Sequence, residues 1–404
     1  MSRNLTVVTI IFTICLALAI LGGLVWANTL YVRAQPVEKQ FLVPWLAART
    51  YITYGISPYD DQSTQRAQVV YYGRLAAEDE DPLRLSVMLP VELLYFPFAF
   101  VTDYPLARGL WMTLGEIALA AVAFLCLSLT GWKPRRFLLP VVLLFGVFWT
   151  YAFFALRGGS PAPFVVLGLL GAFAALRAER DELAGAFLSL FLFEPGLAPV
   201  FLFFLLWWTA SQRRWRVWLG FLMAAGFLAI VSFFLVPDWF LPWARGVYSH
   251  SQHNPGLTVA GLLADWWPAL GLKLSLALTA VLGLMLFLEW RALRGADSRH
   301  FLWTASLTLA AAPLLGLPTS LDAYLLLLLP LTLLLSVASE RWTGMRAALV
   351  SGGILLGVFA ILWLASGSVH ALFLVLPFLL LAGLYWMRWW AVHPPRTWVE
   401  TLPK

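Results

Sequence analysis

The chain has 404 residues, of which 61% are hydrophobic and only 12% are charged, and its mean hydropathy is +0.81. A soluble domain is about 25% charged, so this composition excludes a soluble globular protein and indicates a polytopic membrane protein. Lys and Arg exceed Asp and Glu by six, and we attribute this excess to membrane topology rather than to nucleic-acid binding. Cys15 and Cys126 lie in apolar runs, so no disulfide framework or thiolate metal site is expected.

The first apolar run, 7–27, is longer than the roughly 7–15 apolar residues of a signal peptide, which predicts an uncleaved first span. Residues 32–103 follow as a long polar insert with six basic and nine acidic side chains. Within it, the acidic run 77–81 is typical of a solvated loop. The stretch 85–100 is apolar but is interrupted by prolines and Glu92, so it is either one crossing or a re-entrant hairpin.

The remaining apolar runs predict further membrane-spanning helices. They cover 104–130, 137–156, 163–176, 217–236, 272–288, 301–315, 321–337, 347–364 and 371–386. The run 183–210 is cut in half by Glu194-Pro195-Gly196, and both of its ends are basic. We interpret it as two short helices that enter the membrane and return, because non-helical backbone at that depth must pack in protein or line a cavity.

Clusters of Lys and Arg in short loops mark the cytoplasmic face of a membrane protein. They fall at 133–136, 177–180, 213–216, 291–299, 341–346 and 388–396. These clusters alternate with loops that are poor in basic residues only if both termini are cytoplasmic and 85–100 does not cross. The pattern predicts an all-α protein with about 12 crossings, built as a single transmembrane domain over 1–404. Its long extracytoplasmic loops are about 32–103 and about 237–270.

A series of short motifs recurs in one order along the chain. It comprises Gln40-Phe41, Trp45, Ala47-Ala48-Arg49, Gly55, Pro58-Tyr59, Tyr95-Phe96-Pro97, Gly158-Gly159-Ser160, Ala184-Gly185 through Glu194-Pro195, Asn254-Pro255-Gly256-Leu257, and Pro318-Thr319-Ser320-Leu321-Asp322. In this order and spacing, over about residues 5–340, the chain resembles the GT-C membrane glycosyltransferases. More closely, it resembles the glycosyltransferase 87 family of polyprenyl-phosphate-mannose-dependent alpha-mannosyltransferases. The resemblance implies transfer of a mannose-like sugar from a polyprenyl-phosphate donor to a lipid or glycan acceptor outside a bacterial-type plasma membrane.

Two positions depart from the family pattern. The loop Asp that the family is expected to use as general base is Gln40 here, and an amide cannot accept a proton at neutral pH. The Lys of a Lys-Pro pair is Glu194. A second hypothesis is therefore a non-catalytic relative that binds a lipid-linked ligand. A third is a transporter, although the asymmetric first loop and the lack of internal repeats argue against it.

Sugar transfer needs a carboxylate that accepts the proton of the acceptor hydroxyl. The candidates in the first loop are Glu38 and Asp60. On an ideal helix Glu38 and Gln40 point about 200 degrees apart, so Glu38 replaces the missing Asp only if the backbone changes its path. The alternatives are that Glu38 pairs with Lys39 or Arg33 at the surface and that Asp60 caps a following helix.

The leaving phosphate needs cations, and the extracytoplasmic candidates are Arg49, Arg157, Arg245, His250 and His253. The guanidinium fork suits phosphate oxygens, and Arg157 lies in a glycine-rich turn before a helix, where backbone donors favour anions. Arg157 alternatively reaches lipid headgroups. The two histidines, at i and i+3, have metal-ligand spacing but no convincing third ligand, so no metal and no other cofactor is expected.

The matched motifs add Gln40, Tyr59 and Asn254 to the expected substrate-binding residues. Glu194 and Asp322 lie near membrane depth and complete this set. Glu194 either hydrogen-bonds backbone amides at a helix break or faces the substrate cavity. Asp322 is either a helix N-cap or part of a cavity wall.

The alternation of basic loops makes a testable prediction about topology. In a chain whose native cysteines are replaced, single cysteines at Ser211 and Ser298 should react with a membrane-impermeant thiol reagent only from the cytoplasmic side. A cysteine at Ser251 should react only from the outside. Labelling of Ser251 and Ser298 from the same side would contradict the topology.

Overall fold

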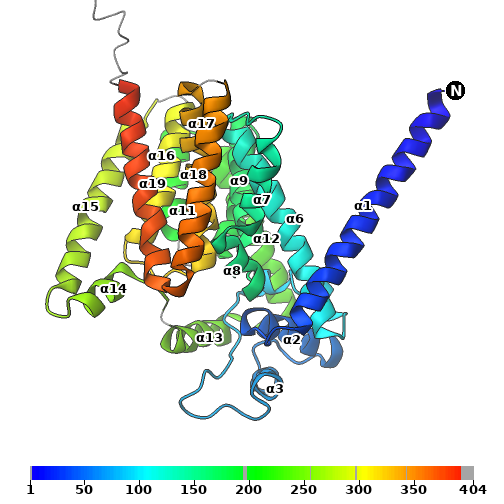
Figure 1. Cartoon of the computed structure of the whole chain (residues 1–404). Coiled ribbons are helices and arrows are strands. Elements are labelled where there is room, and N and C mark those ends of the chain that lie inside the picture. The colour runs from blue at the N-terminus through cyan, green and yellow to red at the C-terminus, as the bar shows by residue number, and fades with distance from the viewer. Residues whose placement is uncertain (1, 194–197, 255, 296–297, 343, 393–404) are drawn as a thin grey trace, which may run out of the picture. The chain divides into compact units, whose positions relative to one another are not determined.

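The computed structural model describes residues 2–193, 198–254, 256–295, 298–342 and 344–392. The described residues form helices, turns and one isolated antiparallel bridge between Leu257 and Thr319, so the all-α class is confirmed (Figure 1). The chain divides into two compact units. Unit 1 is Met1–Leu119, Phe154–Phe164 and Gly226–Pro255, and unit 2 is Ala120–Phe153, Val165–Ala225 and Gly256–Lys404.

Seven helical segments in the described part of the chain are long and apolar enough to cross a membrane. They are Ile11–Arg33, Tyr104–Thr130, Trp215–Leu235, Gly271–Ala292, Leu321–Arg341, Gly344–Gly367 and Val369–Trp389. The helices α7 (Leu138–Phe148) and α8 (Thr150–Gly158) are bent by 46° and make an eighth candidate if they count as one span. Several long apolar helices identify an integral membrane protein, whereas its orientation stays a prediction.

The predicted number of about 12 crossings is not confirmed, because several predicted segments form short helices. These segments are α9 (Ala162–Arg177), α10 (Asp181–Ser189) with the 3-10 helix η1 (Leu190–Phe193), α11 (Ala198–Ser211), and α16 (Ser298–Ala311). The run 301–315 shows the reason. Its α-helix ends at Ala311, and the 3-10 helix η2 (Ala312–Leu314) follows. Pro313 in η2 lacks the N–H that a continuing α-helix needs. Apolar length in the sequence thus overstates helix length here.

Unit 1 contains the polar first loop. Its elements are α1 (Ser2–Arg33), α2 (Lys39–Tyr54), α3 (Asp61–Tyr72), α4 (Leu89–Glu92), α5 (Phe96–Ala99), α13 (Phe240–His253) and parts of α6 (Tyr104–Thr130), α8 and α12 (Trp215–Leu235). The helices α4 and α5 have four residues each, so 85–100 forms no span, as predicted. Gly55 ends α2 with φ 68°, the left-handed conformation that glycine adopts without a Cβ penalty.

Unit 2 is mainly a bundle of long helices. Besides α7, α9, α10, η1, α11, α16 and η2, it contains α14 (Val259–Trp266), α15 (Gly271–Ala292), η3 (Leu321–Leu327), α17 (Leu328–Arg341), α18 (Gly344–Leu364), η4 (Ala365–Gly367) and α19 (Val369–Val392). Figure 1 shows α14 and α15 joined as a hairpin and α16, α17, α18 and α19 side by side. The helix α17 lies within the bundle, since most of its first nine residues are buried.

A carboxyl group lies in the apolar core of unit 1. Glu92 at the end of α4 is fully buried, and its two oxygens make no hydrogen bond within the part of the chain that the structure describes. Burial raises the pKa of Glu92 well above its ordinary value. Burial likewise raises the pKa of Tyr59. Burial therefore favours the protonated, neutral form of Glu92 in the folded protein.

This raised pKa predicts how stability depends on pH. Above the ordinary pKa of a glutamate, the unfolded chain releases a proton that folded Glu92 keeps, so stability falls as pH rises toward the folded pKa. The slope approaches about 1.4 kcal/mol per pH unit. Glu92→Gln should remove this contribution in melting curves recorded from about pH 5 to about pH 8. Glu78→Gln, at an exposed loop position, is the control, and parallel curves for wild type and Glu92→Gln would contradict the assignment.

Candidate functional site

The first turn of α2 lies against the end of α8 in unit 1. Glu38 is the N-cap residue of α2, with extended φ of −101° and ψ of 126°, so it lies outside the helix. Its Oε1 atom is 3.3 Å from Nε of Arg157. Gln40 approaches the same turn, because a Cβ added to Gly158 would lie 2.1 Å from Gln40 Oε1. The opposed directions expected on an ideal helix do not occur, and Glu38 and Gln40 both reach the Arg157–Gly158 turn.

Gly159 permits this close approach. Its φ of +78° is unfavourable for residues with a side chain. A Cβ added at this position would also lie 2.6 Å from Phe41 Cβ. Phe41 is fully buried and packs its ring 5.8 Å from Trp111 and 5.9 Å from Tyr104, between centroids. The glycine turn therefore positions α2 against a rigid aromatic core.

Arg108 in α6 is a site residue that the motif pattern did not select. Its side chain is fully buried, and it makes no ion pair within the described residues. It donates hydrogen bonds to the Tyr104 hydroxyl oxygen at 3.3 Å and to the Arg157 carbonyl oxygen. The Tyr104 hydroxyl in turn bonds the backbone N–H and carbonyl of Glu38, both at 3.4 Å. The sequence signal that could have identified Arg108 is its position inside the apolar run 104–130, because charged residues within membrane segments are usually functional.

A second polar cluster joins the start of α2 to the end of α13. Lys39 Nζ lies 2.7 Å from Asp81 Oδ2 and 2.9 Å from Asn254 Oδ1, and Asn254 Nδ2 lies 3.0 Å from Asp81 Oδ2. Burial opposes ionisation of Asp81, but hydrogen bonds from Lys39, the Leu83 backbone and Asn254 outweigh it and lower its pKa. The interpretation of 77–81 as a solvated loop is thus wrong for Asp81, which is mostly buried.

Three predicted site residues in the first loop make contacts that stabilise the fold. Tyr59 is buried and donates its hydroxyl to the Val87 carbonyl at 2.7 Å. Asp60 caps α3 by accepting the Gln62 N–H at 2.8 Å, which is the alternative predicted for it. Arg49 donates to the Ala99 carbonyl at 3.1 Å. None of these contacts joins them to Glu38 or Arg157.

The predicted cations of the second loop lie on α13. Arg245 and His253 are exposed, and Nδ1 of His253 is 2.9 Å from the Ser249 carbonyl oxygen. Partial burial of the His250 ring lowers its pKa. The Asp81 charge opposes this shift, whereas Lys39 and His253 add to it. Among the described residues, no three His, Cys, Asp or Glu side chains gather at one point.

Two predicted site residues lie elsewhere. Glu194 falls outside the described residues. Asp322 belongs to unit 2, where it is buried in the first turn of η3. The N-cap position of η3 is occupied by Ser320, whose side chain makes no capping bond, so the N-cap assignment of Asp322 is wrong.

The arrangement in unit 1 suits chemistry at an anionic group. A half-buried carboxylate and a guanidinium are in contact, and the buried Arg108 adds positive charge behind them. The first-turn N–H groups of α2 have no intrahelical acceptors, and the helix dipole favours an anion there. A proton acceptor and donors for an anion are thus found around one turn.

The glycine turn makes a prediction about stability. Gly159→Ala should lower the free energy of unfolding by at least about 1–3 kcal/mol, because it combines left-handed strain with a clash against Phe41. Gly22→Ala is the matched control, since an added Cβ there meets no atom within 4 Å. Melting of the purified chains in detergent measures both. Equal melting temperatures would show that α2 does not depend on this turn.

A comparison with protein families shows the relationship of the chain. The model of glycosyltransferase family 87 matches residues 90–318, more than half of the chain. This range contains Arg108, Arg157 and Asn254, whereas Glu38 and Gln40 precede it. No curated protein and no solved structure matches the chain. The extent of the family match shows that the chain belongs to glycosyltransferase family 87.

Proposed function

We propose that this chain transfers a mannose-like sugar from a polyprenyl-phosphate donor to an extracytoplasmic lipid or glycan acceptor. Membership of glycosyltransferase family 87 supports glycosyl transfer. The observation that carries the residue assignment is the contact between Glu38 and Arg157. It supplies a carboxylate and a phosphate-binding group at the same turn.

In the proposed reaction, Glu38 is the general base. The acceptor hydroxyl gives its proton to the Glu38 carboxylate as its oxygen bonds the anomeric carbon of the sugar. The bond between that carbon and the donor phosphate oxygen breaks, and polyprenyl phosphate leaves with the bonding electron pair. General-base assistance of this kind contributes about 10²- to 10⁴-fold in rate.

Arg157 has two partners in this scheme. In the absence of substrate its guanidinium pairs with Glu38. A bound donor phosphate would compete for the same guanidinium and release Glu38 to act on the acceptor. The ion pair thereby couples donor binding to activation of the base. Arg108 acts as a positioning residue, because it bonds the Arg157 carbonyl and the Tyr104 hydroxyl rather than facing solvent.

The second candidate function is a non-catalytic relative that binds a lipid-linked ligand. Gln40 favours this non-catalytic function. Its exposed amide reaches the Arg157–Gly158 turn, but an amide cannot accept a proton at neutral pH. In that case Glu38 serves only to hold Arg157. The two functions differ in whether neutralising Glu38 removes a measurable reaction.

Transfer of radiolabelled sugar by the purified protein, from defined polyprenyl-phosphate donors to a membrane lipid extract, tests the proposal. Glu38→Gln should reduce the rate by about 10²- to 10⁴-fold, because the amide keeps the shape but accepts no proton. Asp60→Asn is the matched control. It removes the other predicted base, and asparagine still caps a helix, so the rate and melting temperature should stay near those of wild type.

The outcomes separate the assignments. A large loss in Asp60→Asn but not in Glu38→Gln would make Asp60 the base. If transfer is observed and neither Glu38→Gln nor Asp60→Asn slows it by as much as tenfold, the first loop is excluded as the catalytic loop. If no donor supports transfer by the wild type while Gln40→Asp creates it, the non-catalytic function is correct.

A further inference from the structure

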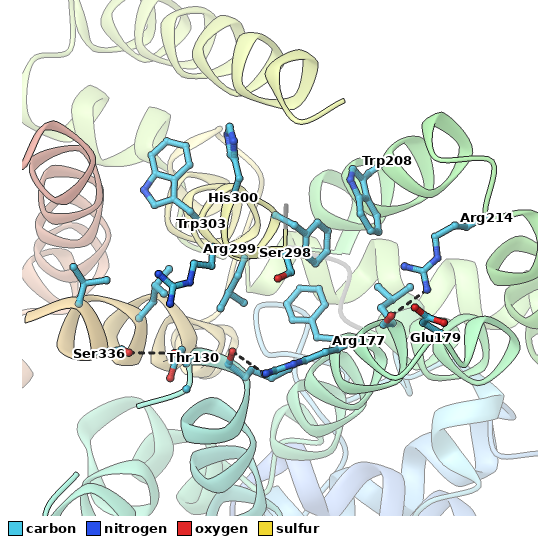
Figure 2. A pocket seen from close by; sticks show the side chains of 18 of the residues that line it. Thr130, Arg177, Glu179, Trp208, Arg214, Ser298, Arg299, His300, Trp303 and Ser336 are labelled. Atoms are coloured by element: carbon cyan, nitrogen blue, oxygen red, sulfur yellow. Dashed lines mark hydrogen bonds between the residues drawn. The ribbon is translucent and has the colours of Figure 1, made fainter. Parts of the chain in front are cut away.

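Unit 2 contains a cavity of about 1440 Å³ that the proposed reaction does not use. Seven arginines line it, among them Arg177, Arg214 and Arg299, together with three acidic residues. Figure 2 shows these three arginines approaching the cavity from different segments. Arg177 ends α9, Arg214 precedes α12, and Arg299 begins α16.

The positive charge of this arginine cavity is only partly neutralised. Among the lining arginines, Arg214 pairs with Asp181, Arg216 with Glu182 and Arg388 with Glu289. Arg213 and Arg299 are exposed and make no ion pair among the residues that the structure describes. Their two guanidinium groups are therefore available to an anion, and guanidinium groups bind phosphate oxygens by paired hydrogen bonds.

The walls of the cavity are aromatic and aliphatic. The Trp208 and Phe301 rings lie 4.1 Å apart between centroids, and Trp303 carries the Arg388 guanidinium 4.9 Å above its ring. The cavity exceeds the roughly 300–1,000 Å³ of pockets for drug-sized ligands. A ligand that complements both the arginines and the apolar side chains of the cavity is an amphiphile with an anionic head and an aliphatic chain.

The arginines come from five of the six basic clusters that predict the cytoplasmic face. These are 177–180, 213–216, 291–299, 341–346 and 388–396. Topology alone requires basic residues only near the membrane surface. Their convergence on one cavity with aromatic walls is an additional feature, and basic pockets between membrane helices on this side bind anionic lipid headgroups.

We propose that the arginine cavity binds the phosphate headgroup of an anionic membrane phospholipid, with Arg213 and Arg299 on the phosphate and Trp208 and Phe301 along the aliphatic chain. The site is separate from the Glu38–Arg157 contact in unit 1. It does not rest on the proposed glycosyl transfer, and its occupancy is measured by binding and melting rather than by activity.

Titration of the detergent-purified full chain with phosphatidylglycerol, followed by melting temperature and by native mass spectrometry, tests this proposal. Wild type should show a saturable rise in melting temperature and a retained lipid adduct. The double variant Arg213→Gln and Arg299→Gln should weaken the apparent affinity at least about tenfold, by loss of two charge-assisted contacts. Arg136→Gln is the matched control, because Arg136 is exposed in a basic cluster but does not line the cavity.

Three outcomes would overturn the proposal. An equal effect of zwitterionic phosphatidylcholine would show that the phosphate charge is not recognised. An equal effect of inorganic phosphate would assign the site to a soluble anion. An equal loss in Arg136→Gln would reduce binding to general surface charge. If the double variant does not fold, Arg299→Gln alone provides the same comparison, since Arg299 is exposed.

Discussion

The buried guanidinium of Arg108 is the constraint on which the proposed site depends. Removing an ion from water costs several kcal/mol unless polar partners replace the water. Its two partners are the Tyr104 hydroxyl and the Arg157 carbonyl, and Tyr104 also bonds the backbone of Glu38. The partners of this one buried charge therefore link the start of α2 to the end of α8. The glycines that follow Arg157 then allow the two segments to approach within contact distance.

Arginines in the two units meet different physical requirements. In unit 1, Arg157 faces a carboxylate, and that pair balances its own charge. In unit 2, seven arginines line one cavity. Arg214, Arg216 and Arg388 pair with acidic residues, whereas Arg213 and Arg299 make no ion pair among the described residues. From the sequence alone, a basic cluster that binds a ligand looks the same as one that only marks the cytoplasmic face, because the positive-inside rule also produces clusters of Lys and Arg. Only the positions of the acidic and aromatic neighbours separate topology from ligand binding.

The sequence predicted the class of fold and much of the first loop because those features depend on local pattern. Hydrophobic runs located the long helices, and Asp60 was predicted as a possible cap from the residues beside it. Helix length was overestimated in runs such as 301–315, where the α-helix ends at Ala311. The Glu38–Arg157 and Lys39–Asp81–Asn254 contacts join residues far apart in sequence, so no local pattern contains them. Arg108 could have been found from its charge within an apolar span, since such a charge needs a partner or a function.

Two glutamates of the first loop, Glu38 and Glu92, show why residue type alone does not identify a base. Glu92 is fully buried, and burial raises its pKa well above the ordinary value, which favours the protonated form that cannot accept a proton. Glu38 is half-buried, and its carboxylate is in contact with the Arg157 guanidinium. Gln40, at the position where the resemblance places the family's base, has no ionisable group. Of these three residues, Glu38 alone combines a carboxyl group with exposure to solvent, and the extended backbone at the N-cap brings it to the turn that Gln40 also reaches.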